Sequence, residues 1–200
     1  MKTAYIFDFD GVLAKTMEAH FACCKQALAE VGVPIDREIF FVQAGMTGRE
    51  MLAYFIAKAG RTIDVETVYR RKGELYGSYT HEVSIIEGNR ELLRLLRANG
   101  NPVAIASGSS MPSISPVMER YGIEVDAIAT SADVKRGKPN PDLFLKAAEK
   151  LGVPPETCVV IEDSEVGIEA AQRAGMRAMR FYDLRLGPEP HGGRQDGGSP

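Results

Sequence analysis

The chain has 200 residues, which is enough for one domain of ordinary size or for a core domain that carries a small insert. Its content of 44% hydrophobic and 26% charged residues is that of a globular protein, and a net charge of −3 excludes a basic surface for nucleic acid or an anionic membrane. No apolar run approaches the roughly 20 residues of a membrane span, and the start of the chain lacks the pattern of a signal peptide.

The first predicted element is a buried strand over residues 3–9, whose apolar run is interrupted by Asp8 and followed by Asp10. Two carboxylates so close together repel each other and resist desolvation. They therefore form either a solvated turn or a site that a positive group holds together. The rest of the chain has to decide between these alternatives.

Residues 15–82 form a block of amphipathic helical patterns without a clear strand. We expect this block to be a helical cap, inserted after the first strand and placed over the mouth of a sheet. It joins the rest of the chain through two short links, near residues 14–15 and 84–87, and two links on one side are typical of a hinge. The helical patterns lie at residues 17–32, 49–60 and 65–83.

From residue 83 onward, apolar runs alternate with helical patterns. Runs that are continuously apolar are typical of parallel strands buried on both faces. Asn140 is the expected N-cap of one helix, with Pro141 at its first position, and Ser164 is the expected N-cap of the next. Strands are predicted at residues 102–107, 125–130, 158–163 and 176–182, and helices at residues 89–100, 140–152 and 163–175.

This order of elements predicts an α/β fold with a doubly wound parallel sheet and right-handed crossovers. The catalytic core would comprise residues 1–14 and 83–185, and the helical cap residues 15–82. Residues 186–200 are rich in glycine and proline and are expected to be disordered. The three cysteines, of which two are adjacent, have no metal-type spacing and indicate reduced thiols in a cytoplasmic protein.

Polar residues stand at the points where the predicted strands end. In an open parallel sheet the carboxyl ends of the strands form one edge, and ligands bind there. Each of these residues alone is more often a turn, a helix cap or a solvated side chain, but their joint order indicates a site. A divalent cation would hold the carboxylates together, and oxygen ligands without histidine or cysteine favour Mg²⁺. The residues are Asp8, Asp10, Ser107, Lys138, Glu162 and Asp163.

Four motifs in this order resemble those of the haloacid dehalogenase superfamily: DFDGV (8–12), IASG (105–108), KPNPD (138–142) and VVIEDSEVG (159–167). The resemblance covers residues 3 to about 182 and implies a Rossmann-like core. The helical block resembles the small cap of the subgroup that contains phosphosugar phosphatases and β-phosphoglucomutase. The family usually has a further helix after the last strand, where this chain has its Gly/Pro-rich end.

The resemblance implies a reaction through an aspartyl-phosphate intermediate. Asp8 would attack phosphorus, and Asp10 would protonate the leaving alkoxide and then deprotonate the water that cleaves the intermediate. Crowded carboxylates are expected to keep Asp10 protonated. An aspartate two residues after the nucleophile indicates phosphate-ester chemistry rather than dehalogenation or phosphonate cleavage.

The resemblance also implies how metal and phosphate would be bound. Mg²⁺ would be held by Asp8, Asp163 and the main-chain carbonyl of Asp10. Glu162 would support the metal shell, directly or through water. The phosphate oxygens would be held by Ser107, Gly108 and Lys138.

In the cap, the resemblance assigns residues to the recognition of the substrate. His20 and Lys72 match polar positions that contact the substrate or the acid in β-phosphoglucomutase. The loop that begins at Gly45 resembles the cap loop that recognises the substrate. Arg49 lies four residues after Gly45, whereas the mutases carry their phosphate-binding arginine three residues after that glycine. Lys15 stands where the family commonly has an acidic residue, and either attracts an anionic substrate or is a surface change without consequence.

The sequence therefore predicts a Mg²⁺-dependent phosphatase of small phosphorylated metabolites, with sugar phosphates as the expected substrates. A phosphosugar mutase of the β-phosphoglucomutase type is the first alternative. A phospho-acceptor receiver-like domain is the second, although a receiver is shorter and carries its phospho-aspartate on a later strand. A non-catalytic binding protein on the same scaffold is the third. We expect a monomer or a small homo-oligomer whose partner is a small metabolite, with no nucleic acid and no membrane.

Overall fold

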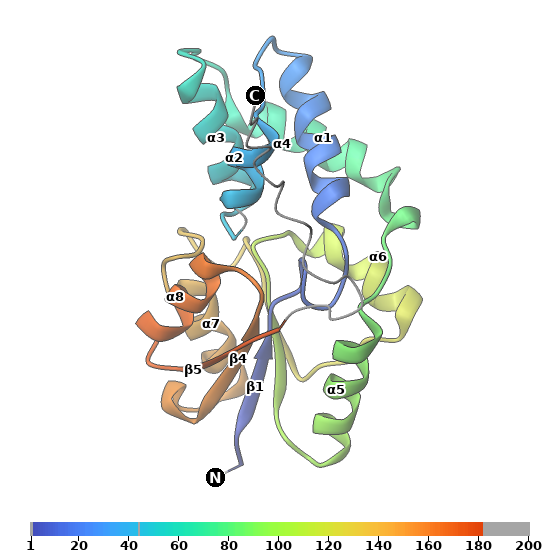
Figure 1. The fold of residues 1–200 in the computed structure, drawn as a ribbon, viewed down its shortest axis with the longest axis vertical. Coiled ribbons are helices and arrows are strands. Elements are labelled where there is room, and N and C mark those ends of the chain that lie inside the picture. Colours follow the sequence, from blue (N-terminus) through green and yellow to red (C-terminus); the bar gives the residue numbers. More distant parts are fainter. Residues whose placement is uncertain (1, 44, 182–200) are drawn as a thin grey trace, which may run out of the picture.

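A five-stranded parallel sheet forms the centre of the protein, for which a computed structural model describes residues 2–43 and 45–181. Its strands are β1 Ala4–Phe7, β2 Val103–Ala106, β3 Ala127–Ala129, β4 Cys158–Glu162 and β5 Arg177–Arg180. They lie side by side in the order β3-β2-β1-β4-β5, which confirms the predicted doubly wound parallel sheet (Figure 1). The central strands β1, β2 and β4 are almost completely buried, as their continuous apolar runs indicated.

Two pairs of helices cover the two faces of the sheet: α5 (Glu87–Ala98) and α6 (Met111–Tyr121) on one face, α7 (Asp142–Leu151) and α8 (Glu165–Arg173) on the other. Phe7 of β1 packs in the apolar cluster of the first face. Its neighbour Ile6 packs in the cluster of the second face, together with Leu143 of α7. The two residues go to opposite sides because successive side chains of a strand alternate.

The helix ends in the second half of the chain follow the sequence, with one exception. The side chain of Ser164 accepts a hydrogen bond from the Gly167 amide, which confirms Ser164 as the N-cap of α8. The prediction that Asn140 caps α7 was wrong, because Pro141 is the N-cap. The Asn140 side chain instead donates to the Gly137 carbonyl at 3.0 Å and closes a turn. A short 3₁₀ helix, Pro155–Thr157, precedes β4.

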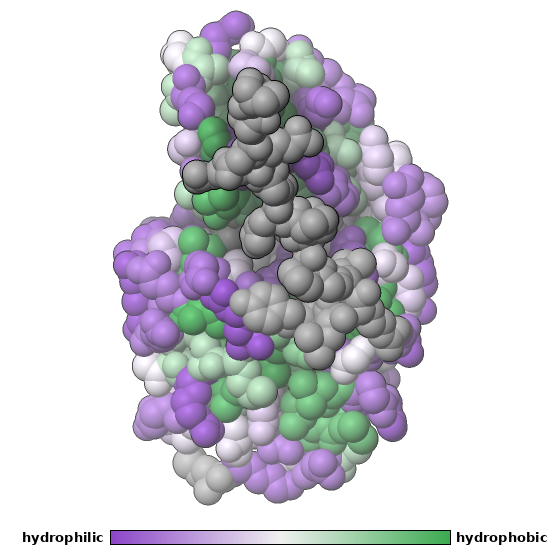
Figure 2. Space-filling model, in the orientation of Figure 1, coloured by the Kyte–Doolittle hydropathy of each residue, from purple (hydrophilic) through white to green (hydrophobic). Residues whose placement is uncertain are grey.

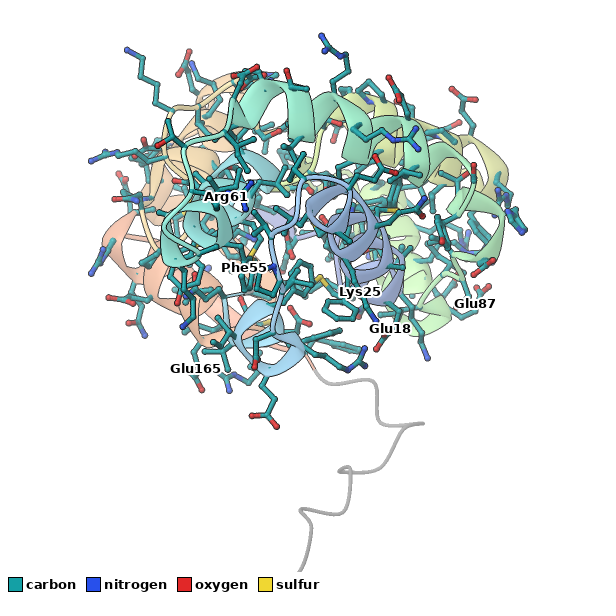
Figure 3. The ribbon with its side chains drawn as sticks, turned by 90° about the horizontal axis from the view of Figure 1, so that it is seen from above. Glu18, Lys25, Phe55, Arg61, Glu87 and Glu165 are labelled. Atoms are coloured by element: carbon teal, nitrogen blue, oxygen red, sulfur yellow. The ribbon has the colours of Figure 1, made fainter. Side chains whose placement is uncertain are left out.

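Four helices between β1 and α5 form a separate group, which we call the helical layer. They are α1 Met17–Ala29, α2 Arg37–Val42, α3 Gly48–Lys58 and α4 Val65–Gly77, followed by a 3₁₀ turn at Thr80–Glu82. The layer lies over one end of the sheet and has its own apolar cluster, which includes Leu28, Leu52 and Phe55 (Figure 1). In Figure 3, Phe55 lies within this layer, whereas Glu87 and Glu165 lie at the periphery. Helix α2 is not among the three predicted patterns, because six residues show too little periodicity.

Two connecting segments lie side by side where the helical layer joins the sheet. Ala14 pairs with Ile85 in an antiparallel bridge, and the Lys15 amide donates to the Ser84 carbonyl at 2.8 Å. The two predicted links are therefore hydrogen-bonded to each other, and the hinge stays a prediction. The boundaries of core and cap stay predictions, and residues 182–200, which include the predicted disordered tail, lie outside the described residues.

On the face shown in Figure 2, hydrophobic residues gather in the lower part, over the sheet and beside α5. Leu95 of α5 and Met179 of β5 are among the large hydrophobic side chains that stay exposed. Met179 is exposed because β5 is an edge strand whose side chains alternate between exposed and half-buried. In residues 2–43 and 45–181, no helix combines the length and the apolar character that a bilayer crossing needs.

The packing of α7 can be tested with a matched pair of leucines on that helix. Leu143 is completely buried, whereas Leu145 is 38% exposed. Leu143→Ala should lower the free energy of unfolding by about 2–5 kcal/mol, because it leaves a cavity in the core. Leu145→Ala removes the same atoms and should lower it by less than about 1 kcal/mol. Urea denaturation followed by circular dichroism measures both values, and equal losses would contradict the assigned face.

Candidate active site

The carboxyl ends of β1 and β4 bring the predicted acidic residues together. In chain order the sheet grows from β1 to β2 and β3, and then continues on the other side of β1 with β4 and β5. Such a change of direction opens a crevice at the carboxyl ends of the two strands. Asp8 follows β1 directly and Glu162 ends β4, so both lie at this crevice.

A cavity of about 80 Å³ lies between this edge of the sheet and the helical layer. Most of the site residues predicted from the sequence line it. Ser107 does not line the cavity but is completely buried beside it, where it contacts Asp10. The predicted residues in the lining are Asp8, Asp10, His20, Gly45, Lys72, Gly108, Lys138, Glu162 and Asp163.

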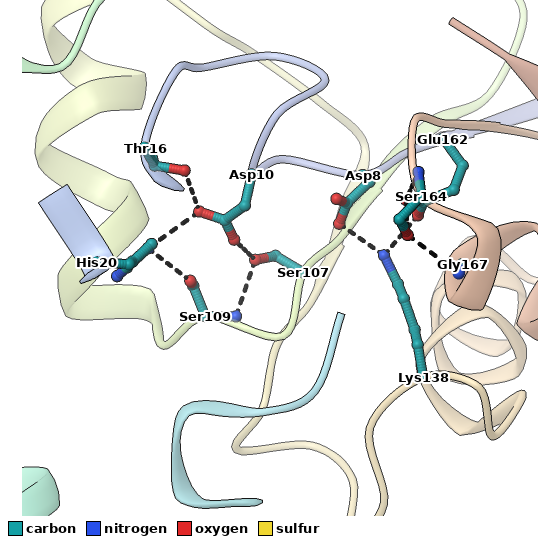
Figure 4. A network of polar contacts seen from close by, with 10 residues as sticks. All are labelled: Asp8, Asp10, Thr16, His20, Ser107, Ser109, Lys138, Glu162, Ser164 and Gly167. Carbon is teal, nitrogen blue, oxygen red and sulfur yellow. Dashed lines mark hydrogen bonds and ion pairs between the residues drawn. The ribbon is translucent and has the colours of Figure 1, made fainter. Parts of the chain in front are cut away.

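Lys138 is the centre of a buried ionic network (Figure 4). Its Nζ lies 2.7 Å from Asp8 Oδ1 and 2.7 Å from Glu162 Oε2. The other oxygen of Glu162, Oε1, accepts hydrogen bonds from the amide and the hydroxyl of Ser164, at 3.1 and 2.7 Å. Lys138 is 2% exposed and Glu162 is 1% exposed. Two buried carboxylates therefore share one ammonium group, and negative charge is in excess.

Burial and the network act on the pKa values of these groups in opposite directions. Burial raises the pKa of Asp8 well above its ordinary value, and the nearby carboxylates add to the rise, whereas Lys138 opposes it. Burial alone would also raise the pKa of Glu162, but Lys138 and Ser164 bring it below its ordinary value. For Lys138, the attraction of the two carboxylates exceeds the effect of burial and raises its pKa. Lys138 and Glu162 thus form a charged pair, and Asp8 is the carboxylate that is incompletely compensated.

Asp163 completes a group of three carboxylates that fits a metal ion. One oxygen each of Asp8, Glu162 and Asp163 lie within 4.8 Å of one another. Burial and the neighbouring Glu162 raise the pKa of Asp163 to about 7. The rise indicates that the three carboxylates together lack a compensating positive charge. A hard cation would supply it, since carboxylate oxygens are the ligands that Mg²⁺ prefers. The residues present therefore fit the ion that the sequence predicted.

Two glycines provide the space for these carboxylates. A Cβ atom at Gly11 would lie 2.3 Å from Asp163 Oδ2, and one at Gly167 would lie 2.1 Å from the carboxyl carbon of Glu162. Gly11 also has a φ of 91°, which other residues rarely adopt. The glycines of the first and last motifs are therefore required by the packing of the site.

Asp10 faces three hydrogen-bond donors instead of the metal-type group (Figure 4). Its Oδ1 accepts from Thr16 Oγ1 at 2.6 Å and lies 3.1 Å from His20 Nε2. Its Oδ2 accepts from Ser107 Oγ at 2.8 Å. Burial alone would raise the pKa of Asp10, but the charge of a protonated His20 and the hydrogen bonds from His20, Thr16 and Ser107 bring it well below its ordinary value. The expectation that crowded carboxylates keep Asp10 protonated was therefore wrong, because these donors stabilise the carboxylate.

Lys72 fixes the tautomer of His20. Lys72 Nζ lies 3.1 Å from His20 Nδ1, and an ammonium group can only donate, so Nδ1 is the acceptor. Nε2 then carries the proton, and it lies 3.1 Å from both Asp10 Oδ1 and Ser109 Oγ. Burial and the charge of Lys72 lower the pKa of His20, although Asp10 opposes the shift, and the neutral ring is favoured. Tyr76 stacks on this ring, with 4.4 Å between the ring centroids.

Thr16 and Ser109 belong to this network, although they were not predicted from the sequence. Thr16 precedes α1 and is completely buried. The Ser109 amide donates to Ser107 Oγ at 2.9 Å, so Ser109 also orients the hydroxyl that binds Asp10. The sequence holds only a weak indication of these two residues: Thr16 is a hydroxyl residue six positions after Asp10, and Ser109 is a second serine in the loop after β2.

The structure does not bring Arg49 to the cavity. Its side chain is 44% exposed, pairs with the Glu66 carboxylate and lies 4.0 Å from the ring centroid of Tyr69. Helix α3 begins at Gly48, so Arg49 lies in the first turn of this helix. Its side chain lies beside α4, where Glu66 and Tyr69 contact it.

Comparison with known proteins identifies relatives of this chain. Residues 5–181 match the family model described as haloacid dehalogenase-like hydrolase. A β-phosphoglucomutase of Bacillus subtilis is 31% identical over 186 residues, which cover 88% of this chain and 81% of the relative. A fructose-1-phosphate phosphatase of Escherichia coli is 29% identical over 188 residues, which cover 90% and 95%. The crystal structure of a β-phosphoglucomutase from Clostridium difficile is similar with a TM-score of 0.81 at 29% identity, covering 89% of this chain and 83% of that one.

The steric role of Gly167 can be tested against a glycine that meets no neighbour. Gly167→Ala should lower the free energy of unfolding by about 1–3 kcal/mol, because the Cβ atom overlaps the Glu162 carboxyl group. Gly73→Ala in α4, where an added Cβ meets nothing within 4 Å, should raise it by up to about 1 kcal/mol through the helix propensity of alanine. Urea denaturation measures both values. Stabilisation by both substitutions would mean that Glu162 moves aside without cost.

Proposed function

Since the chain belongs to the haloacid dehalogenase-like hydrolase family, we propose that it is a Mg²⁺-dependent phosphatase that hydrolyses small sugar phosphates. The reaction would pass through an aspartyl phosphate on Asp8. The observation that carries this proposal is that two aspartates in one cavity have different binding partners. Asp8 is bound to Lys138 beside the metal-type group, whereas Asp10 is held apart by donors of its own.

Asp8 would act as the nucleophile. One of its carboxylate oxygens forms a bond to phosphorus while the bond from phosphorus to the leaving alkoxide breaks. Lys138 Nζ, 2.7 Å from Asp8 Oδ1, holds the carboxylate in one orientation and reduces its repulsion by the phosphate. Gly108 and Lys138 line the cavity and remain the proposed phosphate-binding groups. The Ser107 hydroxyl donates to Asp10, so we assign it to the orientation of the acid–base residue.

Asp10 would move one proton back and forth within each turnover. When water attacks the aspartyl phosphate, the Asp10 carboxylate takes the proton of that water, and the bond between Asp8 and phosphorus breaks. In the earlier step of the same turnover the protonated Asp10 gives its proton to the leaving alkoxide, and the proton of the water restores it. The carboxylate, stabilised by Thr16, His20 and Ser107, is the form that the step with water requires. The negative charge of a bound phosphate favours the protonated form that the first step requires.

Asp8, Asp163 and the main-chain carbonyl of Asp10 would hold Mg²⁺. When bound, the ion would neutralise charge between the attacking carboxylate and the phosphate. Both oxygens of Glu162 already have partners, Lys138 on one and Ser164 on the other. We therefore assign Glu162 to the support of the site through Lys138.

The helical layer would select the substrate. Lys72 lines the cavity and has two N–H groups beyond its contact with His20, which suits it to bind a hydroxyl or anionic group of a substrate. The relatives include a fructose-1-phosphate phosphatase and a β-phosphoglucomutase, which supports sugar phosphates as the substrate class. The oligomeric state and the cytoplasmic location stay predictions.

Hydrolysis is favoured over a mutase reaction by the position of Arg49. A mutase has to hold a second phosphate group, and the arginine expected to do so is paired with Glu66 outside the cavity. A receiver-like domain is not supported, because the family match covers residues 5–181 and the candidate nucleophile follows the first strand.

The proposal is tested by a screen of phosphorylated sugars for release of inorganic phosphate, with p-nitrophenyl phosphate as a generic substrate. Phosphate should be released without a bisphosphate activator, and exhaustive chelation should abolish the activity. Mg²⁺ should restore it, and Ca²⁺ should inhibit, because its larger and more flexible shell disturbs in-line attack. Activity that survives chelation would contradict the metal site, and turnover that requires a sugar bisphosphate would indicate a mutase.

The roles of the two aspartates are separated by substitution. Asp8→Asn should abolish turnover of p-nitrophenyl phosphate without loss of the fold, because a neutral amide does not attack phosphorus. Asp10→Asn should slow turnover by about 10²–10⁴-fold, the range expected for loss of acid–base catalysis. Circular dichroism controls for the fold, and mass spectrometry of trapped enzyme should find phosphate on Asp8. Near-normal turnover of the Asp8 variant would place the nucleophile elsewhere.

A further inference from the structure

Glu50 joins the helical layer to the loop that carries Lys138. Glu50 lies in the first turn of α3, and its Oε1 and Oε2 accept the amide of Gly137 at 3.0 and 3.1 Å. The next amide in the chain, that of Lys138, donates to the carbonyl of Gly45 at 3.2 Å. The amides of Gly137 and Lys138 in this core loop are thus both hydrogen-bonded to acceptors outside the core: the Glu50 carboxylate of the helical layer, and the Gly45 carbonyl of the loop that leads into α3.

The Glu50 carboxylate is also fixed from its own side. Its Oε2 accepts the amide and the hydroxyl of Thr47, each at 2.8 Å. The Thr47 hydroxyl in turn accepts the Glu50 amide at 3.3 Å, which completes a capping box at the start of α3. One carboxylate therefore closes the end of a helix and binds the core, so the position of α3 and that of Gly137 depend on each other.

Gly137 is a glycine because of this contact. A Cβ atom there would lie 2.4 Å from Glu50 Oε2 and 2.7 Å from the Thr47 nitrogen. Gly137 is not among the glycines with a positive φ, so its backbone conformation does not require glycine. The close approach of the helical layer is what excludes a side chain at this position.

We propose that Glu50 is a positioning residue for Lys138, an inference that rests on the function proposed above. The Lys138 side chain has to place Nζ between Asp8 and Glu162, and its main chain is held by the bonds described here. Without the Glu50 carboxylate the loop is free to shift, and the ammonium moves relative to the nucleophile. A displacement of about 1 Å at a reaction centre can lower the rate by about 100-fold.

The contact also connects the docking of the helical layer to the chemistry. Glu50 and Gly45 bind the core loop only where the layer lies against the sheet edge. Movement of the layer away from the core would break both bonds at once. Lys138 is therefore fully positioned only in the docked arrangement, in which the cavity is covered and water is restricted.

The first test compares Glu50→Ala with Thr47→Ala. Both substitutions disrupt the capping box, but only Glu50→Ala removes the acceptor for the Gly137 amide. Both should reduce thermal stability, and Glu50→Ala should reduce it more, because it also leaves the buried Gly137 amide without its acceptor. Glu50→Ala should lower kcat for p-nitrophenyl phosphate by about 10- to 100-fold, whereas Thr47→Ala should lower it by less than about threefold. Equal losses of kcat would overturn the positioning role.

A double substitution tests the pathway through Gly137. As a single substitution, Gly137→Ala should lower kcat, because the Cβ atom of the new alanine displaces the Glu50 carboxylate. In the Glu50→Ala background the same substitution should lower kcat by a smaller factor, since the overlap with the Glu50 carboxylate is absent and only the overlap with the Thr47 main chain remains. Two effects that multiply fully would show that the residues act independently and would overturn the proposal.

Amide hydrogen exchange without substrate separates this inference from the proposed function. In Glu50→Ala the amides of Gly137 and Lys138 should exchange at least about tenfold faster than in the unchanged protein, and in Thr47→Ala they should not. NMR resolves the two amides individually. A protein that hydrolyses no phosphomonoester would refute the proposed function whatever the exchange rates. Unchanged exchange of both amides in Glu50→Ala would refute the positioning of Lys138 by Glu50, even in an active phosphatase.

Discussion

Burial of negative charge at the carboxyl ends of β1 and β4 is the constraint on which the rest of the site depends. Three carboxylates lie within 4.8 Å of one another, and Lys138 compensates only part of their charge. An uncompensated buried ion costs several kcal/mol, so the fold has to hold this ammonium group in one place. The glycines that leave room for Glu162 and Asp163, and the bonds that fix the lysine loop, are consequences of this need.

The two aspartates of the first motif have different surroundings, which is the physical basis of the different functions proposed for them. Asp8 is destabilised as a carboxylate by burial and by neighbouring carboxylates, which suits a group that reacts with phosphorus and binds a cation. Asp10 is stabilised as a carboxylate by donors from three segments of the chain, which suits a group that accepts a proton from water. Environments that separate the pKa values of two neighbouring acids are a physical basis for distinct roles on one strand.

The sequence predicted what depends on local pattern and missed what depends on distant contacts. The buried strands and the Ser164 cap follow from short stretches of the chain, and both were confirmed. The donors around Asp10 come from the turn before α1, from α1 and from the loop after β2, so no local pattern indicates that they stabilise the carboxylate. Asn140 was misassigned as a cap because its side chain bonds backward to Gly137. Arg49 is drawn to α4 by Glu66 and Tyr69, which are remote in sequence.

In the proposed function, the residues around Gly45 and the start of α3 would link substrate selection to phosphoryl transfer. The loop at Gly45 and Met46 approaches the core so closely that a Cβ atom at Gly108 would lie 3.0 Å from the Met46 carbonyl. Its neighbours in α3 bind Gly137 through Glu50. Under that proposal, a substitution in this segment that changes the fit of a substrate would also shift main chain beside the proposed phosphate position. Selectivity and rate would then be coupled, because residues that contact different parts of a substrate would share one set of hydrogen bonds.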